Sequence, residues 1–128
     1  GLVLAAAYDA TGDPRYRASV VAIADILLGR NPLGRSYVSG YGSRPMKKPH
    51  HRFFARSLDP AYPPPPPGFL AGGPNKDSPG EDIARALAKT CAPQKCWLDD
   101  PHAYSLNEVA INWNAPLVWI AAWLDHGD

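Results

Sequence analysis

The chain has 128 residues, of which 45% are hydrophobic and 20% are charged, and its formal net charge is +1. This length and composition are those of one ordinary globular domain, and they exclude a largely disordered chain. A net charge so close to zero does not indicate a nucleic acid or a membrane surface as partner.

The first eleven residues, "GLVLAAAYDAT", predict the end of a helix. Their apolar run is short and no basic residue precedes it, so it is typical of neither a signal peptide nor a membrane span. Since the run starts as the middle of a helix would, we expect this sequence to be the end of a longer protein.

A second helix is predicted after the turn "TGDPRY". Asp13 is suited to cap its N-terminus and Pro14 to occupy its first position. Apolar side chains then recur at steps of 4, 3 and 4 residues, which places them on one helical face: Tyr16, Val20, Ile23 and Leu27. Gly29 is the expected C-cap.

Residues 31–79 predict almost no regular structure beyond a short strand at Tyr37 to Ser39. The segment is rich in Gly, Ser and Pro, and "DPAYPPPPPGF" requires extended, polyproline-like backbone. An irregular segment of this length is uncommon inside a domain, and such segments usually serve a function.

The last third predicts a short helix at Glu81 to Lys89 and a final helix within residues 107–125. The "PLVWIAAWL" part of the final helix is apolar all round, so we expect it to be buried on every side by neighbours that this chain does not contain. Cys91 and Cys96 are equally compatible with two free thiols and with a disulfide; a zinc site would need further ligands.

Charges are distributed unevenly along the chain. No acidic residue lies between Asp25 and Asp59, and no Lys or Arg follows Lys95. The first region carries seven basic residues: Arg30, Arg35, Arg44, Lys47, Lys48, Arg52 and Arg56. The C-terminal region carries Asp99, Asp100, Glu108, Asp125 and Asp128. This separation suggests that the two regions meet in the fold.

The basic stretch "KKPHHRFFAR" allows three interpretations. Binding of a single-stranded nucleic acid is disfavoured, because the acidic C-terminal third would repel it and no known binding motif is present. A solvated basic loop is the plain alternative. We favour a site that holds a polar ligand or orients carboxylates, because two adjacent histidines and an arginine exceed what surface charge requires.

The acidic stretch "WLDDPHAY" also allows two interpretations. Asp99 and Asp100 are suited to form a turn with Pro101, or to ligate a metal together with His102 and neighbouring side chains. We expect no metal site, because neither HxxH nor HxxE helical spacing occurs.

Glu108 lies where the sequence becomes apolar. Alone, a glutamate near a helix start is typically a cap or a partner of the helix dipole. Here it lies near Asp99, Tyr104 and two tryptophans, Trp97 and Trp113. Carboxylates beside aromatic faces suit a carbohydrate site, where rings stack on sugars and acids serve the glycosidic oxygen. We expect Glu108 to be partly buried, which would raise its pKa for that purpose.

Two long stretches resemble the hallmark motifs of glycoside hydrolase family nine, the inverting endoglucanases and related cellulases: "SYVSGYGSRPMKKPHHR" and "WLDDPHAYSLNEVAINWNA". The stretches "TGDPRY", "LLGRNPLGRSYVSGYG" and "GGPN" are similar to that family in the same order. The resemblance implies that residues 1–128 form the C-terminal portion of one catalytic domain. The implied fold is all-α, an (α/α)6 barrel whose long loops, here residues 31–79, build the cleft.

The resemblance also implies roles for individual residues. Glu108 falls on the general acid, and Asp99 and His50 fall on two further catalytic positions. Substrate binding is expected from Arg52, Tyr104 and His51, with Tyr104 stacking on a glucosyl ring. The family's catalytic base belongs to an aspartate motif of the DxGD type far upstream. Neither "DATGD" nor the terminal "DHGD" has the right context, so we expect the isolated chain to be inactive.

The implied activity is hydrolysis of β-1,4-glucosidic bonds in cellulose or related β-glucans by a secreted enzyme. Alternatives are an exo-acting hydrolase releasing cello-oligosaccharides or glucosamine, and a carbohydrate-binding protein without catalysis. We expect no cofactor, while structural calcium in the complete domain stays open. The expected partners are the glucan and the N-terminal part of the same domain, with no nucleic acid and no membrane.

Overall fold

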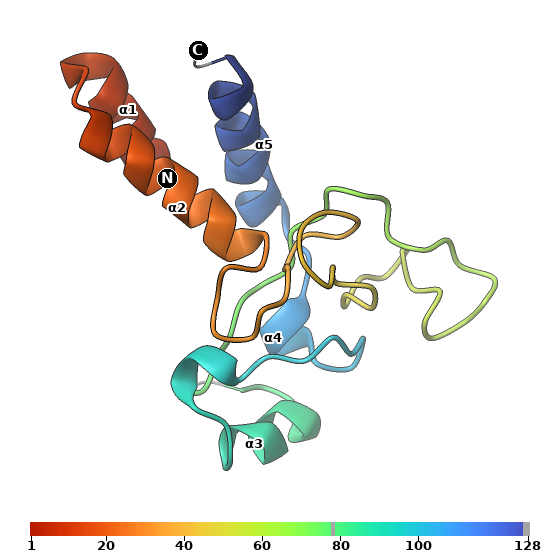
Figure 1. Cartoon of the computed structure of the whole chain (residues 1–128). Helices are drawn as coiled ribbons and strands as arrows, with labels where there is room; N and C mark the ends of the chain where they lie inside the picture. Colours follow the sequence, from red (N-terminus) through yellow and green to blue (C-terminus); the bar gives the residue numbers. More distant parts are fainter. Residues whose placement is uncertain (78, 127–128) are drawn as a thin grey trace.

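The computed structural model describes residues 1–77 and 79–126 and consists of helices joined by long loops. Its elements are α1 (Leu2–Thr11), α2 (Pro14–Leu27), α3 (Asp82–Ala88), the 3-10 helix η1 (Pro93–Lys95), α4 (Tyr104–Asn107) and α5 (Ile111–His126). Helices α1, α2 and α5 lie at one end of the molecule, whereas α3, α4 and the loops form the other end (Figure 1). The last two residues of "DHGD" lie outside the described residues. None of the described helices is long and apolar enough to cross a membrane.

The predicted turn before α2 is confirmed. Asp13 caps the helix by accepting a hydrogen bond from the backbone N–H of Arg15 at 3.0 Å, and Pro14 occupies the first position. The Arg15 side chain also donates to Asp13, which lowers the pKa of that carboxyl group. The predicted C-terminus is displaced slightly, because α2 ends at Leu27 with Leu28 as its cap. Gly29 follows with a φ of 120°, in the region that favours glycine.

The helix predicted within residues 107–125 is α5, which begins at Ile111 and is preceded by the separate short helix α4. Helix α4 ends at Asn107, and Glu108 has extended backbone (φ −63°, ψ 140°) before α5 begins at Ile111. The backbone groups of this break bond to other loops: the Glu108 carbonyl accepts from the Gly72 N–H at 2.9 Å. Tertiary pairing therefore replaces the helical hydrogen bonds that an apolar sequence alone would favour.

The last helix is largely exposed within this chain, so its expected burial stays a prediction about neighbours that the chain does not contain. Ile120 is the one buried residue that the structure describes in α5, whereas Ile111 is 87% exposed and Val118 is 68% exposed. Helix α5 contacts α1 through Trp123, whose indole N–H donates to Asp9 at 3.0 Å. Asn114 also joins α5 to the Leu70 backbone, and Leu117 packs against the core, whereas the face with Val118 is not covered by the described residues.

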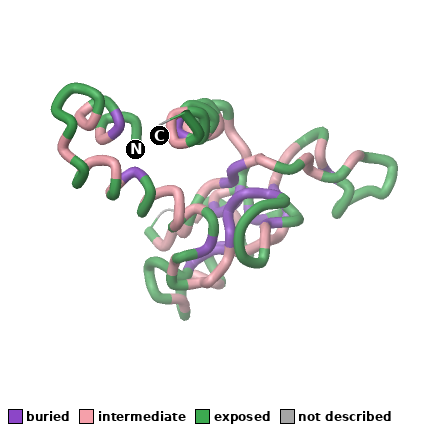
Figure 2. Tube along the Cα trace, turned by 45° about the horizontal axis from the view of Figure 1, so that its top comes forward, coloured by how far each residue is buried: buried purple, intermediate pink, exposed green. Residues whose placement is uncertain are grey.

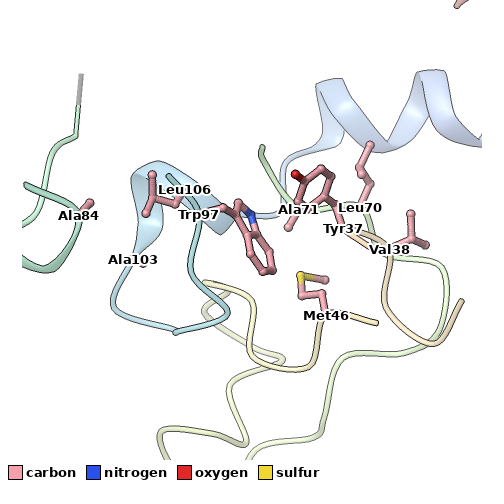
Figure 3. Packing of buried hydrophobic residues seen from close by; sticks show 9 residues of the cluster. All are labelled: Tyr37, Val38, Met46, Leu70, Ala71, Ala84, Trp97, Ala103 and Leu106. Atoms are coloured by element: carbon pink, nitrogen blue, oxygen red, sulfur yellow. The ribbon is translucent and has the colours of Figure 1, made fainter. Parts of the chain in front are cut away.

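The predicted irregular region contains most of the core. Buried residues concentrate in the loop half of the molecule (Figure 2). Nine of them pack together there, from the loops and from α3 and α4 (Figure 3): Tyr37, Val38, Met46, Leu70, Ala71, Ala84, Trp97, Ala103 and Leu106. Burial raises the pKa of the Tyr37 hydroxyl. The long loops are therefore packed structure.

Two of these loops pair at the predicted strand. The expected strand at Tyr37 to Ser39 is a single antiparallel bridge between Val38 and Leu70. Its flanking bonds run from Ala71 N–H to the Tyr37 carbonyl at 3.0 Å and from Ser39 N–H to the Phe69 carbonyl at 2.9 Å. Within the described residues, β-structure is limited to three isolated bridges of this kind.

Cys91 and Cys96 form a disulfide, which resolves the alternatives left open by the sequence. The loop that it closes is attached to the "GGPN" region. The Cys96 carbonyl accepts from the Asn75 N–H at 3.0 Å, and the Cys91 carbonyl accepts from the Lys76 ammonium at 2.7 Å. The disulfide loop and the segment before α3 therefore form one unit next to Trp97.

Candidate functional site

Two segments that are distant in the sequence meet at the candidate site: the basic loop (residues 44–52) and the acidic segment (residues 97–110). They are joined by a parallel bridge between His50 and Glu108. Its bonds run from His50 N–H to the Asn107 carbonyl and from Val109 N–H to the His50 carbonyl, each at 3.3 Å. The backbone thus places the predicted general acid beside the predicted active-site histidine.

Asn107 is the buried centre of this junction, and the sequence did not identify it. Its side chain is fully buried, and its amide nitrogen donates to the carbonyls of Lys48 at 3.0 Å and Asp100 at 2.9 Å. Its amide oxygen lies 3.3 Å from the His50 N–H. A buried amide is stable only when such partners are present. Asn107 therefore ties the basic loop to the acidic segment directly before Glu108.

Asp99 forms the second connection between the two segments. Its carboxylate accepts from the backbone N–H of Lys48 at 2.7 Å and of Lys47 at 3.0 Å, and it forms an ion pair with Arg35 at 2.9 Å. The Asp99 side chain is only 15% exposed. The predicted meeting of the basic and acidic regions is confirmed here. Most of the contacts, however, are made by backbone N–H groups, because the lysine side chains themselves are exposed.

His50 is held in one orientation by the acidic segment. Its Nδ1 lies 2.7 Å from the carbonyl oxygen of Pro101. A carbonyl can only accept, so Nδ1 carries the proton and Nε2 of the neutral ring is an acceptor. The ring of Tyr104 lies close by, with its centroid 5.8 Å from that of His50. The two rings therefore belong to one site.

The predicted burial of Glu108 is wrong in this chain, where the residue is exposed. Its side chain makes no hydrogen bond or ion pair with the part of the chain that the structure describes. The break between α4 and α5 explains the difference, because extended backbone presents this residue on the loop surface. Trp113, the expected apolar neighbour, instead packs its ring against Gly72.

Arg52 and His51 differ in how far they are available to a ligand. Arg52 is exposed, and its guanidinium has no hydrogen bond or ion pair within the described residues. His51 is half-buried, and its Nδ1 accepts from the N–H groups of Phe53 and Phe54, each at 3.0 Å. His51 thus shapes the turn that presents Arg52, and only its Nε2 is left for a substrate.

Asp100 and His102 form a local pair at the edge of the site. The backbone N–H of His102 donates to Asp100 at 2.9 Å, and this bond is the main cause that lowers the pKa of the Asp100 carboxyl group. The His102 ring lies 3.0 Å from the same oxygen and is 71% exposed at the side chain. Within residues 1–77 and 79–126, no group of three His, Cys, Asp or Glu side chains converges as metal ligands would.

Comparisons with known proteins agree on one family. Residues 1–121 match the sequence profile of glycosyl hydrolase family 9. The chain is 44% identical over 127 residues to a cellulose 1,4-beta-cellobiosidase from Acetivibrio thermocellus, covering 99% of this chain and 14% of that protein. It is 46% identical over 125 residues to endoglucanase C from Cellulomonas fimi, covering 96% of this chain and 11% of the relative. The chain therefore spans a small part of the length of the relatives that it matches.

A solved structure supports the same assignment. A thermostable endoglucanase from Alicyclobacillus acidocaldarius superposes with a TM-score of 0.74 at 40% identity, covering 88% of this chain and 21% of that one. The described helices and loops thus have the fold of a segment of an (α/α)6 barrel. Taken with the profile match over nearly its full length, this likeness shows that the chain belongs to glycosyl hydrolase family 9.

Proposed function

We propose that this chain carries the general-acid side of a cellulase-type active site that hydrolyses β-1,4-glucosidic bonds with inversion. The observation that carries the proposal is the placement of Glu108. It is exposed and unpaired within the described residues, yet its backbone is fixed to His50 by the parallel bridge. The buried amide of Asn107 also fixes the residue directly before Glu108 to the basic loop. The names of the relatives, a cellobiosidase and an endoglucanase, supply the substrate class.

In the proposed mechanism Glu108 protonates the departing glycosidic oxygen. An inverting enzyme keeps its acid and its base about 6.5–9.5 Å apart, so that a water fits between sugar and base. We assign the base to the part of the domain that precedes this chain. That part and the substrate would cover Glu108 and leave its carboxyl group beside the glycosidic oxygen, as a general acid requires.

Other residues of the site have separate tasks in this proposal. His50 accepts a hydrogen bond from a sugar hydroxyl at Nε2, because Pro101 holds the proton on Nδ1. Arg52 donates to hydroxyl groups with its free guanidinium. Tyr104, which is 43% exposed, offers a ring face to a glucosyl unit.

Asp99 is a positioning residue in this proposal. All its contacts are with the donors that fix the basic loop, and its side chain is largely buried. With three donors, this carboxylate is held in a fixed position between the two segments. Asp99 therefore acts through the loop that carries His50 and Arg52.

We infer that residues 1–128 are the C-terminal portion of a single catalytic domain, whose remaining helices cover the apolar faces of α2 and α5. These faces form an open groove of about 690 Å³ lined by residues such as Leu28, Leu117 and Leu124. Because the chain spans 11–14% of its relatives, the rest of such a domain supplies the occupant. The disulfide between Cys91 and Cys96 favours a secreted protein, since disulfides persist in oxidising compartments.

The isolated chain is expected to show no glycosidase activity. Its groove between α2 and α5 is uncovered, and the proposed base lies outside the chain. Reducing-sugar assays on carboxymethyl cellulose would compare the purified 128-residue chain with the protein carrying the remaining domain. Activity in the longer protein alone supports the proposal. Turnover by the isolated chain that Glu108→Gln abolishes would show that no further segment is needed.

Arg52→Lys in the longer protein is expected to lower kcat/KM by at least about tenfold, or about 1.4 kcal/mol, while leaving the unfolding temperature unchanged. A lysine keeps the charge but loses the planar fork of donors. Stability should be unaffected, since Arg52 has no partner within the described residues. Arg56→Lys, four residues away on the same exposed loop, is the control. A change in kcat/KM below about threefold for Arg52→Lys would contradict its assignment to the substrate.

A further inference from the structure

We propose that Gly80 and Glu81, together called the clamp, are positioning residues that set the orientation of Tyr104 in the sugar site. This inference rests on the proposed function, because it gives Tyr104 its stacking role. The clamp lies directly before α3, in a part of the sequence that no motif described above includes. It acts on α4, the four-residue helix that leads to Glu108.

Glu81 holds α4 through Ser105. Its Oε1 accepts from the Ser105 backbone N–H at 3.1 Å and from the Ser105 hydroxyl at 3.0 Å, and its Oε2 lies 3.3 Å from the same N–H. Glu81 is also the N-cap residue of α3, but its side chain makes no capping bond there. The carboxylate is thus directed away from its own helix and toward the residue that follows Tyr104.

Gly80 supplies the surface on which the Tyr104 ring lies. A Cβ built on Gly80 would come within 2.4 Å of the tyrosine Oη and within 2.8 Å of Cε2. The φ of Gly80 is not in the left-handed region, so the backbone would accept an alanine. Glycine is needed at position 80 only because a larger side chain would overlap the Tyr104 ring.

The contacts of Gly80 with Tyr104 and of Glu81 with Ser105 restrain α4 independently of the basic loop. Helix α4 has no side-chain cap of its own, and a helix of one turn is not stable without outside contacts. The Tyr104 ring is half-exposed and touches Gly80, while His50 lies 5.8 Å away between ring centroids. Displacing the ring from Gly80 therefore changes the face offered to a sugar without touching Glu108.

A double-mutant cycle in the longer protein tests Gly80. We expect Gly80→Ala to raise KM for cellotetraose about three- to tenfold, the range of an aromatic contact, with kcat within about twofold. Tyr104→Ala should act similarly, and the double variant should equal Tyr104→Ala alone. Gly73→Ala is the matched control, since a Cβ at Gly73 meets nothing within 4 Å. An unchanged KM for Gly80→Ala, or equal loss in the presence and absence of Tyr104, would overturn the proposal.

Hydrogen exchange tests Glu81 without any assay of activity. Glu81→Ala removes the acceptor of the Ser105 N–H, so the Ser105 amide should exchange about tenfold faster or more. Glu81→Gln keeps one acceptor oxygen, so its Ser105 exchange rate should lie between those of the parent protein and Glu81→Ala. Unchanged exchange at Ser105 in Glu81→Ala would overturn the clamp. Failure of the proposed function would appear differently: the unsubstituted longer protein would not hydrolyse the glucan, or Glu108→Gln would leave its hydrolysis unchanged.

Discussion

Glu108→Ala in the longer protein is expected to abolish most cleavage of cellulose and to spare most cleavage of a dinitrophenyl cellobioside. A glucosyl 4-hydroxyl is a poor leaving group unless it is protonated, and loss of a general acid typically costs about 10²–10⁴-fold in rate. A dinitrophenolate leaves without a proton. The ratio of the two losses should therefore be large, and it is the quantity to be measured.

The structure indicates that this substitution tests the role of Glu108 without disturbing the fold. The Glu108 side chain is exposed and has no partner within the described residues, so its removal should leave the unfolding temperature unchanged. Asp82→Ala is a suitable comparison, because the Asp82 side chain is 98% exposed and pairs with Arg85 of its own helix, away from the junction. Equal losses on both substrates for Glu108→Ala would identify a structural carboxylate and place the acid elsewhere.

Asp99→Ala is expected to depress the cleavage of both substrates alike and to lower the free energy of unfolding by about 2–4 kcal/mol. Removing the carboxylate leaves the Lys47 and Lys48 N–H groups and the Arg35 guanidinium without their acceptor. Hydrogen bonds to a charged group contribute about 1.5–3 kcal/mol each when protected from water, and the exposure of Lys47, Lys48 and Arg35 reduces that contribution here. The basic loop should then lose its fixed position, which affects every substrate that His50 and Arg52 bind.

Two measurements on Asp99→Ala distinguish a positioning role from a role in proton transfer. One is the ratio of the losses in cleavage of cellulose and of dinitrophenyl cellobioside, and the other is the free energy of unfolding from chemical denaturation. Asp100→Ala is the matched control, because that neighbouring side chain is 39% exposed and bonds only locally to His102. The lowered pKa of Asp100 means that its own small contribution is present at neutral pH and is lost as the pH falls through its folded pKa. A large substrate ratio for Asp99→Ala with unchanged stability would make Asp99 a participant in proton transfer.

Local chemistry made part of this protein predictable. Asp13 and Pro14 mark a helix start by capping rules that need no tertiary context, and the structure confirms both. The long motif stretches pointed to the family, and the comparisons confirm it. The basic and acidic regions were expected to meet because opposite charges were separated in the sequence, and the Arg35 to Asp99 ion pair shows that they do.

What the sequence determined by itself is therefore the family, the start of α2 and the residue types gathered at the site. The tertiary structure alone decided that the helix ends at Glu108. Its N–H still donates to the Tyr104 carbonyl of α4, but its carbonyl accepts from the Gly72 N–H, and the adjacent Val109 N–H donates to His50. The tertiary structure also decided that Asn107 is the buried junction, which no periodicity reveals because its partners are backbone carbonyls distant in the chain. Hydrogen bonds between loops carry no sequence pattern, since every residue except proline supplies the same N–H and C=O groups.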